Sequence, residues 1–219
     1  LTMSSAMREQ VHLAEQEGTR ALVIAGEGAV LSAGADFSDL KGDLSDLDFD
    51  ARMFELTQHI RKSDLITFAA IQGGCIGAGL DLAMACDFRV AAPDAFFALP
   101  ALQMGILYNP DSLSLMLPGI QPAIARRLLL LAERIGREEA HQAGIVTHLA
   151  QGEGEGSVVG LATLLAAQSA LLPCQAQTTT KSFIAALERG DTCPSLWQSK
   201  REALLMSKDR QTALMGKRN

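Results

Sequence analysis

The sequence predicts an α/β core followed by a purely helical region. Two short apolar runs, at residues 21–25 and 65–71, have the length and composition of buried strands. Helix-like segments alternate with such strands up to about residue 150, and only helical periodicity follows. We therefore expect an α/β core at residues 1–150 and a helical region at residues 151–219.

Start and stop signals bound the expected elements. Residues 3–17 carry apolar side chains at helical spacing, and Gly18 ends that helix. Residues 39–50 are acidic and turn-like, so we expect a mobile loop there, before a helix at 51–62. The remaining expected elements are strands at 87–91 and 95–99 and helices at 80–86, 122–133, 137–143, 157–172, 175–189, 195–207 and 210–217.

Composition and charge argue against several classes of protein. The formal net charge is −6 and the basic residues are scattered, which leaves no electrostatic footprint for nucleic acid. No apolar run reaches the ~18–20 residues of a membrane span, and no signal-peptide pattern is present. The four cysteines have no CxxC spacing, so we expect reduced thiols in a cytoplasmic protein. Because the chain begins at Leu1, we expect that an N-terminal segment such as a hairpin is missing.

Two loops rich in small residues are the strongest candidates for a functional site. They are SAGADF at residues 32–37 and GGCIGAG at residues 73–79. Small residues let the backbone approach a ligand closely, and the first N–H groups of the helix that follows lack partners. Two such donors that converge on one point form an oxyanion hole. Either loop alone is more simply explained as a tight turn, and the spacing fits neither nucleotide-binding glycine motif.

Three segments resemble, in order and separation, the signatures of the crotonase superfamily of enoyl-CoA hydratases and isomerases. They are SAGADF, AAIQGGCIGAGLDLAMACDFRVAAPDAFFALP at residues 69–100, and EEAHQAGIVTHL at residues 138–149. The resemblance covers about residues 1–150. The C-terminal helices, which end in KDRQTALMGKR, resemble the trimerisation region of the family.

This resemblance implies a fold, a ligand and an assembly. The fold is a spiral of ββα units, the ligand is an acyl-CoA thioester, and the assembly is a homotrimer or a dimer of trimers. The backbone N–H groups of Ala35 and Ala78 would polarise the thioester carbonyl. Coenzyme A would enter as part of the substrate, with no separate cofactor and no metal. The residues implied to contact coenzyme A or substrate are Ala33, Gly34, Asp36, Phe37, Gly77, Tyr108 and Asn109.

The resemblance also places the two catalytic glutamates of the hydratases on positions that hold other residues. The first falls on Asp81, and the second on Ala101, which cannot transfer a proton. Because a positioned acid or base contributes roughly 10²–10⁴-fold in rate, hydration by two glutamates is not expected. The sequence is most similar to the dienoyl-CoA isomerase branch, whose further carboxylate falls on Asn109, two residues before Asp111. Asp81 and Asp111 are therefore the candidate catalytic residues, with Tyr108 as a hydrogen-bond donor.

Each acidic candidate also has a simpler structural explanation. Asp81 would offset the dipole of a helix N-terminus, and Asp36 and Asp111 would cap the helices that follow them. Three functions remain open: an isomerase or hydratase that uses Asp81, a decarboxylase that forms its enolate without proton abstraction, and a non-catalytic acyl-CoA binder. Ala101 favours the last two, whereas the two loops and Asp81 argue against the binder.

Overall fold

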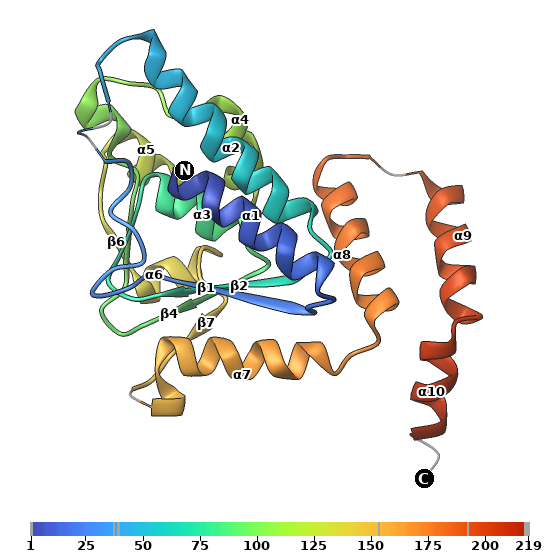
Figure 1. Cartoon of the computed structure of the whole chain (residues 1–219). Helices are drawn as coiled ribbons and strands as arrows, with labels where there is room; N and C mark the ends of the chain where they lie inside the picture. The colour runs from blue at the N-terminus through green and yellow to red at the C-terminus, as the bar shows by residue number, and fades with distance from the viewer. Residues whose placement is uncertain (1, 37, 39, 153, 192, 217–219) are drawn as a thin grey trace.

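A parallel sheet of four strands lies at the centre of the fold. Its order is β1-β2-β4-β7, and every neighbouring pair is parallel. The strands are β1 (Ala21–Ala25), β2 (Ile66–Ile71), β4 (Phe88–Ala91) and β7 (His148–Leu149). The computed structural model describes the chain except residues 1, 37, 39, 153, 192 and 217–219. The α/β class with a helical C-terminal region is confirmed (Figure 1).

The alternation of side chains along β2 explains why this sheet is covered on both faces. All six residues of β2 are buried. Phe68 and Ala70 belong to one apolar cluster, and Ala69 and Ile71 belong to the other. Successive side chains of a strand point to opposite faces, so a strand covered on both sides is a continuous apolar run.

Helices cover the two faces of the sheet. The larger apolar cluster lies under three helices, α1 (Met3–Gln16), α2 (Leu47–Lys62) and α3 (Ala78–Ala85). The opposite face is covered by α7 (Val158–Ala170), which packs against β1 and β2 (Figure 1). α7 contributes Val158, Ala162 and Ala166 to the second cluster.

A smaller sheet of three strands carries one of the glycine-rich loops. Its order is β3-β5-β6, with β3 parallel to β5 and β5 antiparallel to β6. The strands are β3 (Gly74–Ile76), β5 (Phe96–Ala98) and β6 (Ile135–Gly136). The helices of this part are α4 (Pro110–Met116), α5 (Pro122–Leu130) and α6 (Arg137–Gln142), with 3₁₀ turns at Pro100–Met104 and Leu117–Gly119.

The acidic segment at residues 39–50 differs from the loop that the sequence predicts. Leu44–Asp46 forms a 3₁₀ turn, and α2 already begins at Leu47. The acidic side chains supply the reason. The Asp43 carboxylate accepts a hydrogen bond from Ser45 N–H, and the Asp46 carboxylate accepts from two backbone N–H groups upstream. The carboxylates therefore cap local structure here, and the prediction of a loop up to residue 50 was wrong.

Three helices follow α7 at the C-terminal end. They are α8 (Cys174–Glu188), α9 (Pro194–Leu205) and α10 (Lys208–Gly216). α9 and α10 extend away from the sheets, and α9 contacts α8 through the rings of Phe183 and Trp197, with centroids 4.8 Å apart (Figure 1). Within the described residues, no single helix has the length and hydropathy to cross a membrane. α7 and α8 meet both criteria only when they are taken together, and a bend of 112° separates them.

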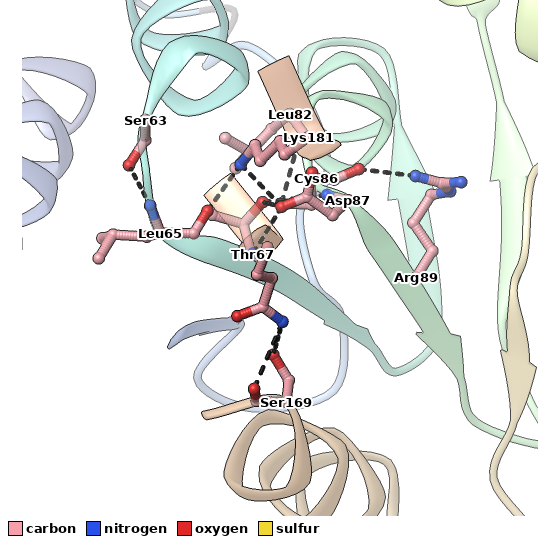
Figure 2. Close-up of polar contacts among 10 residues, drawn as sticks. Ser63, Leu65, Thr67, Leu82, Cys86, Asp87, Arg89, Ser169 and Lys181 are labelled. Carbon is pink, nitrogen blue, oxygen red and sulfur yellow. Dashed lines mark hydrogen bonds and ion pairs between the residues drawn. The ribbon is translucent and has the colours of Figure 1, made fainter. Parts of the chain in front are cut away.

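A buried ionic network fixes α8 to the central sheet (Figure 2). The ammonium group of Lys181 donates to the Leu65 carbonyl at 2.6 Å and to Asp87 Oδ2 at 2.8 Å. The same Asp87 oxygen accepts from the backbone N–H and the hydroxyl of Thr67. The Lys181 and Asp87 side chains are only 12% and 23% exposed, so both charges are largely removed from water. The network therefore joins β2, the end of α3 and α8 at one point.

We predict that Lys181→Met lowers the free energy of unfolding by roughly 2–3 kcal/mol, because it leaves the Leu65 carbonyl and a largely buried carboxylate without their shared donor. Urea denaturation followed by circular dichroism measures the change.

Arg8→Met is the matched control, because Arg8 pairs with Glu55 on the exposed faces of α1 and α2. An exposed pair contributes below about 1 kcal/mol. Equal losses of stability in the two variants would contradict the role given to Lys181.

Candidate active site

The two small-residue loops are joined by hydrogen bonds. Ser32 N–H donates to the Gly74 carbonyl at 3.2 Å, and Ile76 N–H donates to the Ser32 carbonyl at 3.1 Å. The Ser32 hydroxyl in turn accepts from Gly34 N–H at 3.2 Å. The loop that follows β1 therefore runs beside β3 as a short parallel bridge, although the two segments are some forty residues apart in the sequence.

Beyond this bridge, the loops touch at two glycines. Gly34 has φ +97° and Gly77 has φ +55°, conformations that favour glycine. A Cβ on Gly34 would lie 3.2 Å from the Ile76 carbonyl oxygen, and one on Gly77 would lie 3.9 Å from the Gly34 Cα. Ala35 and Ala78 are the next residues of the two loops, so the contact between the glycines brings their backbones close together.

The backbone N–H groups of the two loops differ in their hydrogen bonds. Gly77 N–H donates to the Ala98 carbonyl at 2.9 Å. In the described part of the chain, by contrast, the Ala35 and Ala78 N–H groups have no hydrogen-bond acceptor. Ala78 is also the first residue of α3, where an N–H lacks an intrahelical partner and the helix dipole favours negative charge.

Asp81 lies one turn further along α3. Its residue exposure is 3%, which makes it the carboxylate most deeply buried among the described residues. Burial raises the pKa of Asp81 above its ordinary value. An interaction with the Ser112 side chain and the charge of Arg61 act in the opposite direction, and the like charge of Asp50 adds to the rise.

The groups that act on Asp81 come from two other helices. Ser112 lies on α4 and is buried, and Asp50 and Arg61 lie on α2. Both helices pack against α3. Sequence reasoning did not single out any of these three residues. A signal was present nonetheless, because Asp50, Thr57 and Arg61 recur at helical spacing on one face of α2.

Tyr108 lies at the end of the loop before α4, where the charges of Asp81 and Asp50 act on it. Burial, followed by the charges of Asp81 and Asp50, raises the pKa of the Tyr108 phenol, which therefore keeps its proton. Its ring packs against the larger apolar cluster. The position suits the hydrogen-bond donor that the sequence suggests.

Asp111 and Asn109 line a groove of about 610 Å³ between α2 and the start of α4. Asp50 and Phe54 of α2 line its opposite side, but Asp81 and the two loops do not contribute to it. The Asn109 side chain accepts from the N–H groups of Asp111 and Ser112, at 2.9 and 3.3 Å. Asn109 therefore caps α4, and the prediction that Asp111 is the cap was wrong, because the cap precedes the proline that opens the helix.

The remaining candidates lie in or near the first loop. Ala33 and Asp36 are exposed. The Asp36 carboxylate accepts from the N–H and the hydroxyl of Ser38, which lowers its pKa. Phe37 lies outside the described residues. Ala101, on the second glutamate position, is 5% exposed and places a methyl group in the interior.

The described site thus combines two adjacent backbone loops, in which the Ala35 and Ala78 N–H groups have no acceptor, with one buried carboxylate. Backbone donors of this kind can stabilise an oxyanion, and a buried carboxylate can transfer a proton. Comparison with known proteins agrees. The family model "Enoyl-CoA hydratase/isomerase" matches residues 1–209. The chain therefore belongs to the enoyl-CoA hydratase/isomerase family, and the predicted crotonase fold is confirmed.

Individual relatives differ in the reaction that they are named for. A probable enoyl-CoA hydratase echA6 of Mycobacterium bovis is 36% identical over 143 residues, which are 65% of this chain and 58% of the relative. A mitochondrial Delta(3,5)-Delta(2,4)-dienoyl-CoA isomerase of Pongo abelii is 32% identical over 145 residues, 59% of this chain and 44% of the relative. The matches thus cover only about half the length of these relatives.

A solved structure confirms the fold over nearly the whole chain. The enoyl-CoA hydratase/carnithine racemase of Magnetospirillum magneticum superposes with a TM-score of 0.89 at 23% identity, over 99% of this chain and 82% of that chain. At this identity, the likeness shows the fold alone.

We predict that Gly79→Ala weakens acyl-CoA binding by roughly tenfold or more. The added Cβ would lie 2.5 Å from the Ser32 Cβ, so the first loop must move away from α3. Isothermal titration with a saturated acyl-CoA measures the effect without turnover.

Gly152→Ala is the control, since a Cβ there meets nothing within 4 Å and φ is not positive. If Gly79→Ala binds acyl-CoA as tightly as Gly152→Ala does, the junction of the two loops does not form the thioester site.

Proposed function

We propose that the chain is an acyl-CoA enzyme that stabilises a thioester enolate between the N–H groups of Ala35 and Ala78, with double-bond isomerisation favoured and hydration as the next candidate. One observation carries the proposal. Gly34 and Gly77 approach each other at the point where both loops present free N–H donors, and a buried carboxylate follows one helical turn later.

In the proposed isomerisation, the Asp81 carboxylate removes a proton from the carbon next to the thioester carbonyl. The electron pair moves to the carbonyl oxygen, whose negative charge the two N–H groups and the N-terminus of α3 stabilise. The protonated Asp81 then returns the proton to the carbon at the far end of the shifted double bond. Atoms and electrons balance within the substrate, and coenzyme A takes part only as the carrier of the acyl group.

The acyl chain is proposed to run from Asp81 past Tyr108 towards the groove between α2 and α4. A volume of about 610 Å³ is within the usual range for a small-molecule pocket. Asp111 lines that groove and is the proposed second proton carrier for substrates whose double bonds extend further from the thioester. The first loop, around Ala33 and Asp36, is proposed to hold the nucleotide end of coenzyme A.

Ala101 supports a second candidate. Its buried methyl group supplies no second acid or base to the hydratase mechanism. A decarboxylase of the same fold needs no base, because loss of carbon dioxide forms the enolate directly. A non-catalytic acyl-CoA binder needs no acid and no base. Assay of enoyl-, dienoyl- and carboxyacyl-CoA thioesters separates the three: binding without turnover of any of them identifies the binder.

We predict that Asp81→Asn lowers isomerase turnover by roughly 10²-fold or more and leaves acyl-CoA affinity nearly unchanged, because the proposed binding donors are backbone groups. In the wild-type enzyme, kcat/KM should fall as pH decreases through the raised pKa of Asp81, since the base must be ionised. Full turnover in Asp81→Asn would show that Asp81 is not the base.

The same variant should be more stable than the wild type at neutral pH. A raised pKa in the folded state favours folding at low pH, and this contribution is lost as pH rises through it. Asparagine removes the ionised form, so thermal denaturation should show a gain at pH 7 that shrinks in acid. A lower melting temperature for Asp81→Asn at pH 7 would contradict this assignment.

We further propose that the chain assembles as a homotrimer or a dimer of trimers. α9, α10 and the turn between them expose Leu196, Leu205, Met206, Leu214 and Met215. Apolar side chains grouped in this way mark association surfaces.

We predict that sedimentation at micromolar concentration gives the trimer mass, and that Leu205→Glu with Met206→Glu shifts it to the monomer. A wild-type monomer under these conditions would contradict the proposal.

A further inference from the structure

Arg61, near the C-terminal end of α2, carries a charge that has no ion-pair partner within 4 Å among the residues that the structure describes. Its Nε and Nη2 atoms are buried, and within the described residues no hydrogen-bond acceptor contacts either of them. Burial lowers the pKa of this guanidinium. An arginine side chain nonetheless keeps its charge in proteins. Leaving a buried charge without hydrogen bonds is unfavourable by several kcal/mol in general. The chain thus retains a destabilising group beside its candidate site.

Arg61 lies on α2 and Asp81 on α3, and these two helices pack against each other. Asp81 of α3 is the strongest favourable influence on its pKa, ahead of Glu188 of α8, the Cys86 thiol and Asp87. Glu188 is exposed, so water screens its charge. Asp87 already accepts the hydrogen bonds of the α8 network. The remaining carboxylate is Asp81, which is buried.

Arg89 of β4 is a second cation near Arg61, but its own contacts are complete. Its guanidinium donates to the carbonyls of Cys86 and Ile145. The like charges of Arg89 and Arg61 repel each other. The pKa of each guanidinium is lowered mainly by burial. Arg89 therefore holds the end of α3 through the Cys86 carbonyl.

The Asp81 carboxylate is influenced by groups from α2, α4 and the loop before α4. Ser112 of α4 interacts with its carboxylate, the Tyr108 phenol lies near it, and Asp50 of α2 repels it. Among the described groups that act on Asp81, Arg61 is the one cation. No ion pair within 4 Å joins the two described side chains. Unlike a direct bidentate pair, this arrangement leaves the carboxylate oxygens free for a substrate proton.

We propose that Arg61 is a positioning residue for the proposed reaction: its buried, unpaired guanidinium faces Asp81 across the α2–α3 contact and keeps that side chain ionised as a base. The proposal rests on the function assigned to Asp81 above. Arg61 itself touches no substrate. It supplies positive charge at a separation that offsets desolvation of Asp81 and its repulsion by Asp50 without occupying the oxygens that react.

The test compares Arg61→Met, which keeps the length and removes the charge, with Arg61→Lys, which keeps the charge. The titration of the Asp81 carboxyl is measured by infrared difference spectroscopy on the full chain, with Asp81→Asn as the blank. In Arg61→Met, the Asp81 pKa should rise, and kcat/KM at pH 5.5 should fall roughly 3- to 10-fold while converging with the wild type at alkaline pH. Arg61→Lys should restore most of the wild-type profile.

Two controls separate this role from a purely structural one. Arg52→Met alters an exposed arginine of the same helix, and Glu188→Gln removes the other carboxylate that Arg61 faces. Neither should move the Asp81 titration. A folded Arg61→Met with unchanged Asp81 titration, or Glu188→Gln that reproduces its shift, overturns the proposal. If Arg61→Met does not fold, failure of Arg61→Gln to raise the Asp81 pKa overturns it equally.

The infrared measurement also separates this inference from the proposed function. If no acyl-CoA is turned over and the Asp81 titration still moves in Arg61→Met, the proposed isomerase activity fails while the electrostatic link stands. If turnover depends on Asp81 and the Asp81 titration does not change in Arg61→Met, the proposed isomerase activity stands while the electrostatic link fails.

Discussion

The contact between residues 34 and 77 is the constraint on which the candidate site depends. Both residues adopt left-handed backbone conformations, and a Cβ on Gly34 would meet the Ile76 carbonyl at 3.2 Å. Side chains are therefore excluded from the place where the two chain segments meet. Each of the two sheets positions one of the two loops that meet there. β1 of the larger sheet leads into the first loop and β3 of the smaller sheet lies within the second, so strand pairing brings the backbones of the two loops together.

Much of the fold could be predicted from the sequence because the signals are local. The run at residues 21–25 coincides with β1, and the run at 65–71 contains β2. Both strands are buried on two faces, which makes their apolar runs continuous and easy to locate. The two loops were also found by composition alone, because close approach of backbones requires small residues. β3 was missed, since three residues within a glycine-rich loop carry no strand periodicity.

The environment of Asp81 could not be predicted in the same way. Ser112, Asp50 and Arg61 come from helices whose orientation about their own axes is set by packing against α3. Sequence spacing shows which residues share a face of α2, but it does not show what that face contacts. The capping of α4 is a similar case: Asn109 and Asp111 are both good caps by composition, and the chain direction at Pro110 decides between them.

The ionic network of Lys181 divides the helical end of the chain into two energetic regions. α8 is fixed to β2 through charges that are largely withdrawn from water. α9 follows after a short connection, and one aromatic pair joins it to α8. The contacts that join the two small-residue loops come from residues 32–77, so they do not depend on where α9 and α10 lie. The C-terminal helices and the candidate site are therefore separate parts of the fold.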